Sequence, residues 1–467
     1  MLKNKKFARY AIAFCILGIV WMFFYSGLQN DQINIIQGYS AWNNQATLIP
    51  MTVGNLVCIA LTLVYGTCFI KFGVRKTLLP CTLVAALGCA GIAAANGIAS
   101  LSGLEVASAA AGDAAVQGSY VLYAISLFLV RCTCMCFQMS GFQLAASWFI
   151  RYRGRVLGII TLGSPLFSVI GTSIMNTIVG TKLHGDYRPF YYGLCVVLVI
   201  MAILNYALLR DYPEDVGLFP DGADTAPKSE AGDEVKLTVG QVLSMKKSWI
   251  MIINYGVYQF IINCCMASMV AWFVHLALTY SDVIAAGPLG GAMGQLGPMV
   301  LFLGQAAKWL SVGAIVGIPM SFIFGVIDDK LGTPVASLVL GITEFLPVIG
   351  LMAQKSAVAA TGTCSVPLLV LWGFGVACMT GGVPTMHPAS ISFAFGRREY
   401  QAANRIIMAI QLIPCAFAAN IMVALFGKPG NPNDLAAYIM CLVAIVIGII
   451  FTIPMFKMKD ANAADRG

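Results

Sequence analysis

Long apolar runs, each about 20 to 30 residues, recur along the whole chain and alternate with short polar segments. A helix of about 20 apolar residues is long enough to cross the hydrocarbon layer of a bilayer. Lipid offers the backbone no hydrogen-bond partner, so runs of this length predict an all-α membrane protein. Twelve spans are predicted: 8–28, 48–70, 78–96, 119–148, 156–179, 190–209, 248–279, 298–327, 334–353, 365–388, 403–426 and 434–457.

The composition agrees with a bilayer as the solvent. Of the 467 residues, 59% are hydrophobic and only 10% are charged, whereas soluble domains carry about 25% charged residues. The formal charge of +8 does not indicate nucleic-acid binding, because the cations lie in short loops between apolar runs. Most of the 15 cysteines fall inside those runs, and no Cys/His grouping has zinc spacing. We therefore expect no metal and no cofactor.

The distribution of Lys and Arg predicts the orientation in the membrane. With the N-terminus inside, 22 of the 28 fall in cytoplasmic segments, as the positive-inside rule requires. The exceptions are Lys182, Arg188, Lys355 and Lys428 outside, and Arg131 and Lys308 within spans. We expect a multi-pass protein of a bacterial inner membrane with both termini in the cytoplasm. The N-terminus could also pass for a signal peptide, but no small-residue cleavage site follows, which favours a retained first helix.

One polar stretch, 210–247, divides the chain into two six-helix halves, 1–209 and 248–467. It holds 8 of the 20 acidic residues and several Pro and Gly. Its end, 237–247, is either a short amphipathic helix on the membrane surface or part of a flexible linker.

A short turn occurs once in each half. The first copy is Gly66-Thr-Cys-Phe-Ile-Lys-Phe-Gly73-Val-Arg75-Lys76, and the second is Gly325-Val-Ile-Asp-Asp329-Lys330-Leu-Gly332-Thr. Each copy has two glycines separated by six residues, charge around the second glycine, and an apolar run on either side. The spacing of the copies, 259 residues, indicates an internal repeat.

The two halves, the central loop and the repeated turn resemble the major facilitator superfamily, whose turn reads Gly-x-Leu-x-Asp-Arg-x-Gly-Arg-Arg. The resemblance implies a fold of twelve helices in two pseudo-symmetric bundles, and gating roles for Gly73, Arg75, Asp329, Lys330 and Gly332. In the family the acid of this turn caps and pairs across the two halves at the cytoplasmic side. Ile70 occupies that position in the first copy, which predicts an asymmetric gate that favours opening inward.

Local motifs resemble the oxalate/formate antiporter and monocarboxylate-transporter-like branch. They are Trp148-Phe-Ile-Arg-Tyr-Arg153-Gly154, Asp211-Tyr-Pro-Glu-Asp-Val-Gly-Leu-Phe-Pro-Asp-Gly, the lead-in from Leu237 to Trp249, and Phe395-Gly-Arg-Arg-Glu-Tyr. An arginine of the oxalate branch is replaced by Ser321, and the span 403–426 has no lysine. Oxalate itself is therefore not expected, whereas a related organic anion is. The drug-antiporter signature is only weakly echoed, in Gly163-Ser-Pro165.

Charged residues at membrane depth are the first substrate candidates, since they are costly unless they face a cavity or a partner. Arg131 lies 17 residues before Trp148, about 25 Å from the cytoplasmic edge, with Gln138 on the same face. Lys308 has a similar depth in the other half. Each is either a cation for an anionic substrate or a side chain that snorkels to the headgroups.

Two carboxyl groups are candidates for proton coupling. Glu344 lies in the middle of the ninth span and either carries a proton or is a structurally bonded acid. Asp31 ends the first span and either takes part in coupling or is a polar helix end in water.

A face of the seventh span carries Tyr255, Gln259 and Asn263 at helical spacing, with Tyr258 beside them. These side chains bind the substrate or join helices. Trp372 and Tyr25 either line the cavity or pack in the core. The glycine pairs Gly154/Gly158 and Gly313/Gly317 have close-approach spacing, either between the halves or within one.

The sequence thus predicts a secondary active transporter, not an enzyme, that moves a small or medium organic anion by alternating access, through antiport or proton symport. The expected partners are the substrate, protons and the lipid bilayer, with no nucleic acid, and the protein is expected to be a monomer. Alternatives are proton-coupled efflux of drugs or other hydrophobic metabolites, a transporter-like sensor, and a membrane-embedded enzyme.

Overall fold

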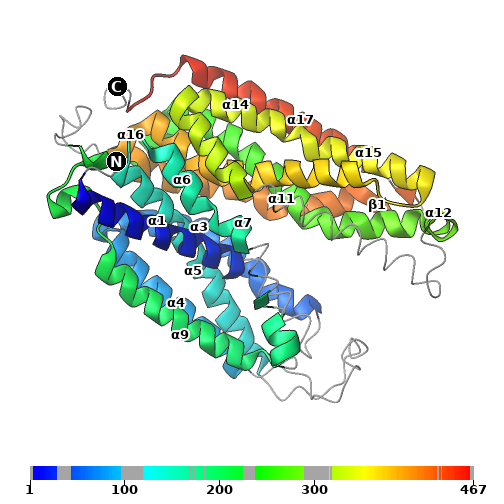
Figure 1. Cartoon of the computed structure of the whole chain (residues 1–467), viewed down its shortest axis with the longest axis horizontal. Helices are drawn as coiled ribbons and strands as arrows, with labels where there is room; N and C mark the ends of the chain where they lie inside the picture. Colours follow the sequence, from blue (N-terminus) through cyan, green and yellow to red (C-terminus); the bar gives the residue numbers. More distant parts are fainter. Residues whose placement is uncertain are drawn as a thin grey trace.

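Two helical bundles form the molecule (Figure 1). They meet at the end where both chain termini lie, called here the terminus end, and diverge toward the opposite end. The computed structural model describes residues 4–28, 44–95, 119–167, 171, 174–175, 177–183, 186–223, 237–288, 315, 318–428, 431–432 and 434–462.

The helices coincide closely with the apolar runs. The first bundle contains α1 (Lys5–Ser26), α3 (Asn44–Phe72), α4 (Val74–Ala94), α5 (Tyr120–Trp148), α6 (Arg153–Thr161), α7 (Gly163–Leu166), a π-helical turn (Thr177–Lys182) and α9 (Arg188–Leu208). The second contains α10 (Val239–Ser244), α11 (Lys246–Thr279), α12 (Ser281–Ala286), a helix at 318–331, α14 (Thr333–Thr343), α15 (Phe345–Thr361), α16 (Val366–Phe426), α17 (Asp434–Thr452) and a 3-10 turn (Ile453–Lys457). A two-residue ladder joins β1 (Gly427–Lys428) to β2 (Asn431–Pro432).

The all-helical membrane fold is confirmed. Among the described residues, seven helices are long and apolar enough to cross a membrane, and a shorter apolar helix covers Leu56–Phe72. The predicted span 298–327 lies mostly outside the described residues, although its second part is helical.

Three predicted boundaries were wrong. The fifth span is divided into α6, α7 and the π-helical turn. The ninth continues to Thr361 and is interrupted at Glu344. The segment 389–402, expected as a loop, is helical except at Gly396, so that α16 is two helices joined at one residue.

Single glycines make three of the helix-to-helix joints at the terminus end. Gly73 separates α3 from α4, Gly332 separates the helix at 318–331 from α14, and Gly396 divides α16. Their φ angles are +81°, +89° and +73°, with ψ between 158° and 178°. This region of backbone space is essentially restricted to glycine. The two glycines of the repeated turn therefore have a structural cause, because each reverses the chain within one residue.

Close packing holds each bundle together and fixes the faces that it presents. In the first bundle, the Trp21 indole donates to Asn205 Oδ1 at 3.0 Å and joins α1 to α9. Gly88 lets α4 approach α5, since a Cβ there would lie 2.6 Å from Val130 Cγ2. In the second bundle, Asn254 Nδ2 donates to Gly448 O at 2.6 Å and joins α11 to α17. Each bundle is thus a packed body.

We predict that Gly332→Ala destabilises the protein by about 1–3 kcal/mol, because an L-residue is strained at this φ and ψ. The effect reports backbone strain alone, since the nearest atom to a Cβ at this position is Pro334 Cδ, 3.8 Å away. The check is thermal unfolding of the purified protein. Gly193→Ala is the matched control, since Gly193 is within α9 and a Cβ there meets nothing within 4 Å. Equal unfolding temperatures for the two variants would contradict the assignment.

Candidate functional site

The two bundles touch backbone to backbone at the terminus end. Gly154 and Gly158 of α6 face Gly325 and Ser321 on the helix at 318–331. A Cβ on Gly154 would lie 2.5 Å from Gly325 O, and one on Gly158 would lie 2.5 Å from Ser321 O. The expected role of this glycine pair in a contact between the halves is therefore seen, whereas Gly313 and Gly317 lie outside the described residues.

Asp329 completes the start of α6 from the opposite bundle. The first turn of α6 has no side-chain cap of its own and no acidic residue. Instead the Asp329 carboxylate accepts from Gly154 N at 2.9 Å and from Arg155 N at 3.1 Å, and pairs with Arg155 Nε at 3.2 Å. These amides are the second and third of the helix, the ones that an N-cap normally satisfies. The neighbouring Asp328 instead accepts from Thr333 Oγ1 at 2.5 Å, at the start of α14.

The first copy of the turn is built differently. Asp211, which follows α9, accepts from Arg75 N at 2.9 Å at the start of α4. The Arg75 side chain turns away from the other bundle, toward the Tyr206 ring and Tyr206 O. Ile70, at the position equivalent to Asp329, is 43% exposed. This copy therefore contacts the second bundle without an acid.

That contact is made one turn earlier, where Arg405 Nη1 donates to Thr67 Oγ1 at 2.7 Å. A Cβ on Gly66 would collide with Arg405 Cβ. Lys330 is exposed, and it appears in none of the four ion pairs of the described residues.

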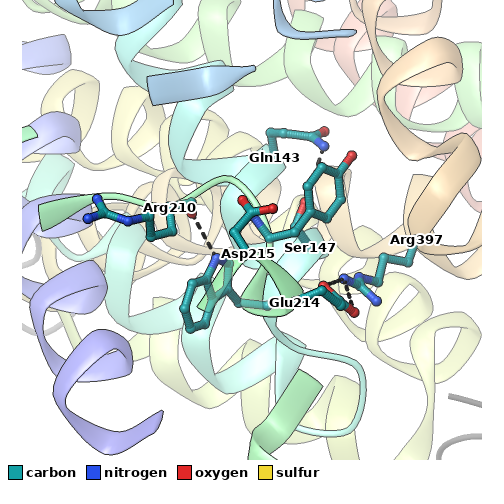
Figure 2. Close-up of polar contacts among 8 residues, drawn as sticks. Gln143, Ser147, Arg210, Glu214, Asp215 and Arg397 are labelled. Atoms are coloured by element: carbon teal, nitrogen blue, oxygen red, sulfur yellow. Dashed lines mark hydrogen bonds and ion pairs between the residues drawn. The ribbon is translucent and has the colours of Figure 1, made fainter. Parts of the chain in front are cut away.

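The segment 210–223 is packed against both bundles (Figure 2). The Trp148 indole donates to Arg210 O at 3.0 Å. Glu214 accepts from Arg397 Nη2 at 2.8 and 2.9 Å, which ties the segment to the second bundle beside Gly396. Asp221 accepts from the backbone amides of residues 150 and 151 at 3.1 and 2.7 Å.

A buried arginine adds a further contact between the bundles. Arg153 is 1% exposed, and its guanidinium donates to Ser392 Oγ at 2.6 Å and Ala389 O at 3.2 Å on α16. Deeper in the molecule, the hydroxyls of Thr161 and Thr385 lie 2.7 Å apart. The motifs around Arg153, Glu214 and Arg397 are thus brought together in one place. The sequence showed them only as separate local signatures.

In the first bundle, the structure places two of the predicted substrate residues on α5. Arg131 is 3% exposed and packs over Gly54 of α3, where a Cβ would lie 2.8 Å from Arg131 Cβ. Gln138 is 8% exposed, and its Oε1 accepts no hydrogen bond from a described residue. Tyr25 is partly buried on α1 and packs against the core. Lys308 and Asp31 lie outside the described residues.

In the second bundle, the tyrosines of α11 point into the core. The Tyr255 hydroxyl bonds to that of Ser337 on α14, and the Tyr258 hydroxyl lies 3.2 Å from Thr452 Oγ1 on α17. Trp372 is 2% exposed and packs beside Gly350 of α15. For the two tyrosines these contacts agree with the alternative that their side chains join helices, and for Trp372 the burial agrees with packing in the core. A direct substrate role for the three residues stays without structural support.

Gln259 and Asn263 follow Tyr255 by four and eight residues on α11, and both are half-buried. Asn263 Nδ2 donates to Gln259 O at 2.7 Å, and the amide of Asn263 also reaches the Cys415 thiol on α16. The Gln411 side chain reaches His387 and donates to Met251 O at 2.9 Å.

Glu344 occupies the break between α14 and α15 and is 0% exposed. No described residue gives a hydrogen bond to either of its oxygens. It points into the second bundle near Tyr258, Cys265 and Cys441, away from the contact between the bundles. Within the described residues no group of three His, Cys, Asp or Glu side chains could hold a metal ion.

We predict that Asp329→Ala weakens the closed terminus end. The change leaves two α6 amides without an acceptor, and loss of a helix cap costs about 1–2 kcal/mol, which is about a 5- to 30-fold shift in the equilibrium. Hydrogen exchange of peptides covering 153–161 is the measurement, with faster exchange expected. Lys330→Ala, at the exposed neighbouring position, is the control and is expected to leave exchange unchanged. Identical exchange in both variants would contradict the role of Asp329.

The closed end should also respond to pH. Burial, and after it the charge of Asp328, raises the pKa of Asp329 to about 6. The hydrogen bonds from the Arg155 and Gly154 amides and the charge of Arg155 act in the opposite direction but are outweighed. A solvated Asp has a pKa of about 3.9. The closed arrangement therefore binds a proton more tightly than an open one. Closure is favoured most below about pH 4, and the advantage is lost as pH rises through about 6.

We accordingly expect the amides of α6 to be better protected at pH 5 than at pH 7.5, after correction for intrinsic exchange. Asp329→Asn, which keeps an acceptor oxygen and cannot titrate, should remove this difference. A pH response that persists in Asp329→Asn would show that another group is responsible.

Comparisons with known proteins identify the fold. The model of the Major Facilitator Superfamily matches residues 10–419. The structure is similar to the proton:xylose symporter XylE, at TM-score 0.57 and 13% identity, covering 98% of this chain and 99% of that one. It is also similar to the Major Facilitator Superfamily transporter FucP in the outward conformation, at TM-score 0.61 and 14% identity, covering 97% of this chain and all of that one. A structure of the E. coli fucose:proton symporter matches at TM-score 0.58 and 13% identity, with 97% and 100% covered.

No curated protein matches the sequence, and the resemblance to the oxalate/formate and monocarboxylate branch stays a prediction. The superfamily model, in contrast, covers most of the chain. The chain therefore belongs to the Major Facilitator Superfamily and is a multi-pass membrane transporter, not an enzyme.

Proposed function

We propose that the protein is a secondary active transporter that carries a small or medium organic anion across a bacterial inner membrane, as a monomer with both termini in the cytoplasm. The terminus end is then the cytoplasmic gate. The halves 1–209 and 248–467 act as the two moving bodies, with 210–247 connecting them, and the substrate binds between them near the midplane of the membrane.

The contacts at the terminus end support alternating access. Apolar residues of both halves share one buried cluster. The contacts at this end also include short polar contacts and glycine packing, namely Asp329 on α6, Glu214 with Arg397, and Arg153 with Ser392. Such contacts can be exchanged for water without unfolding either bundle. By contrast, Trp21 with Asn205 and Asn254 with Gly448 lie inside a bundle. The halves can therefore separate at this end while each keeps its own core.

The observation that carries the anion assignment is Arg131. The residue is 3% exposed on α5 and lies at membrane depth, about 25 Å from the end of the helix by its rise of 1.5 Å per residue. Arginines at such depth are functional by default, because desolvation is costly. A guanidinium binds a carboxylate strongly, through two parallel hydrogen bonds. Lys308, at a similar predicted depth in the other half, would hold the same anion from the opposite side.

The polar face of α11 supports a hydrogen-bonding surface on the second half. Gln259 and Asn263 are half-buried there, and amides can donate to a carboxylate or to hydroxyl groups of the substrate. Of the residues of the second half that were predicted from the sequence and that the structure describes, we retain these two as substrate-binding residues. Gln138 is their counterpart on α5.

Protons or a counter-anion would drive transport. Glu344 and Asp31 remain the coupling candidates, and the similar structures include two proton symporters. Glu344 lies inside the second bundle, so coupling through it would act on the packing of α14, α15 and α17 rather than through direct contact with the anion.

Flux into proteoliposomes tests the proposal directly. A panel of mono- and dicarboxylates is compared with a neutral sugar and a lipophilic cation, with and without a pH gradient. We predict that one class of carboxylate is transported and that Arg131→Gln lowers kcat/KM by about 10- to 100-fold, the loss expected for a charge-assisted hydrogen bond worth about 1.5–3 kcal/mol. Arg131→Lys should retain part of the activity.

Arg151→Gln is the matched control, since Arg151 is exposed at the terminus end and should leave flux unchanged. Transport of the lipophilic cation alone would favour the efflux alternative. Unchanged carboxylate flux in Arg131→Gln would exclude Arg131 as the anion-binding residue.

A further inference from the structure

An apolar groove opens on the side of the first bundle. It is remote from the terminus end, where the two bundles contact each other. It lies between α1, the segment after α7 and α9, and has a volume of about 390 Å³. Aromatic rings line much of it, and glycines leave it open. The lining includes Phe23, Phe24, Phe167, Phe190, Gly27 and Gly193. The volume is within the range of small-molecule sites, about 300–1,000 Å³.

The groove lies in the half of the membrane opposite the terminus end. Gly27 and Leu28 follow the last turn of α1, and Pro189 and Phe190 form the first turn of α9. Val197, the last lining residue of α9, is about 12 Å further along the helix from Pro189. The groove therefore extends along about the first two turns of α9, starting at the end of the molecule opposite the terminus end. This is the depth of the lipid acyl chains.

The side of the groove is open toward the surroundings of the bundle. Ile174 and Val197, both lining residues, are 49% and 47% exposed, and Val196 and Ile200 on α9 are 58% and 51% exposed. In a chain that spans a bilayer, such an apolar exposed face contacts lipid tails. A groove in that face is reached sideways from the bilayer.

Two cationic residues lie near the end of the groove that is farther from the terminus end. Arg188 directly precedes the lining residue Pro189, and Lys182 ends the π-helical turn that follows the lining residue Met175 in the chain. Arg188 is held by Asp186 at 2.8 Å, whereas Lys182 is exposed and belongs to none of the ion pairs of the described residues. Only four Lys or Arg residues are expected on this side of the membrane, and two of them lie here.

We propose that this groove binds one acyl chain of an anionic phospholipid from the leaflet opposite the terminus end, with the lipid phosphate beside Lys182 and Arg188. The ring-lined, uncharged interior suits a hydrocarbon chain, and the cations stand where the headgroup begins. This site is separate from the proposed anion site near the midplane, and it stands whether or not the protein carries a carboxylate.

Gly193 supplies the sharpest test. Gly193 lines the groove, and a Cβ at this position meets nothing within 4 Å, so the position has room for a side chain to begin. Gly193→Trp should fill the groove. Ile203→Trp is the matched control, because Ile203 is on the same helix, 62% exposed and outside the groove.

The measurement is native mass spectrometry of the full chain in detergent, titrated with phosphatidylglycerol or with phosphatidylcholine of the same acyl chains. We expect the first phosphatidylglycerol to bind the wild type and Ile203→Trp alike, and Gly193→Trp at least about 10-fold more weakly. Lys182→Gln should reduce the preference for phosphatidylglycerol over phosphatidylcholine while it leaves chain binding intact. Circular dichroism and thermal unfolding check that each variant is folded.

If Gly193→Trp fails to fold, photo-crosslinking of the wild type with a phosphatidylglycerol that carries a diazirine in its acyl chain replaces it. Crosslinks on 163–175 and 188–197 are then expected. Equal lipid binding by wild type and Gly193→Trp, or crosslinks spread evenly over all exposed helices, would overturn the proposal. Loss of substrate binding by Gly193→Trp in lipid-free detergent would also overturn the proposal, because it would assign the groove to the substrate. Loss of a dimer in Gly193→Trp would overturn it as well, because it would assign the groove to a second copy of the chain.

Discussion

The start of α6 depends on an acid from the other half of the molecule. Its first amides need an acceptor where glycine packing excludes water, and the helix brings no cap of its own. Asp329 supplies that acceptor across the contact between the halves. The closed terminus end is therefore an N-cap shared between two bodies. When the two bundles separate, water must accept the hydrogen bonds that Asp329 accepted before. Losing this cap costs about 1–2 kcal/mol, so the conformational change needs only a few kcal/mol.

The segment 210–223 uses the same principle at neighbouring places. Asp211 accepts a hydrogen bond from an amide at the start of α4, and Asp221 accepts from the amides that precede α6. Glu214 pairs with Arg397 next to the glycine that divides α16. The connection between the halves is thus part of the closed end. Within 210–223, Asp211 and Asp221 are acceptors for helix starts, and Glu214 belongs to an ion pair.

Much of the fold could be predicted from the sequence, because a bilayer forces apolar runs to be helices of known length. The boundaries that were wrong involve features that hydropathy does not register. Gly396 reverses the chain in one residue, so a loop was expected where two helices meet. Glu344 interrupts a continuous apolar run.

The candidate site was less predictable than the fold. Helical spacing put Tyr255, Gln259 and Asn263 on one face, but the tyrosine hydroxyl bonds within the bundle while the amides are half-buried. Spacing along one helix does not reveal what the neighbouring helix offers. The same limit hid the meeting of Glu214 with Arg397, which are 183 residues apart in the chain.

The central claim is that the closed terminus end opens and closes while each half stays intact. Spin labels at the exposed positions Lys76 and Lys330, introduced through a non-canonical amino acid, report the distance between the halves by pulsed electron resonance. The account predicts two distance populations whose ratio shifts toward the longer one in Asp329→Ala and changes again when a transported carboxylate is added, with each peak position unchanged. A single distance that responds to neither would contradict it.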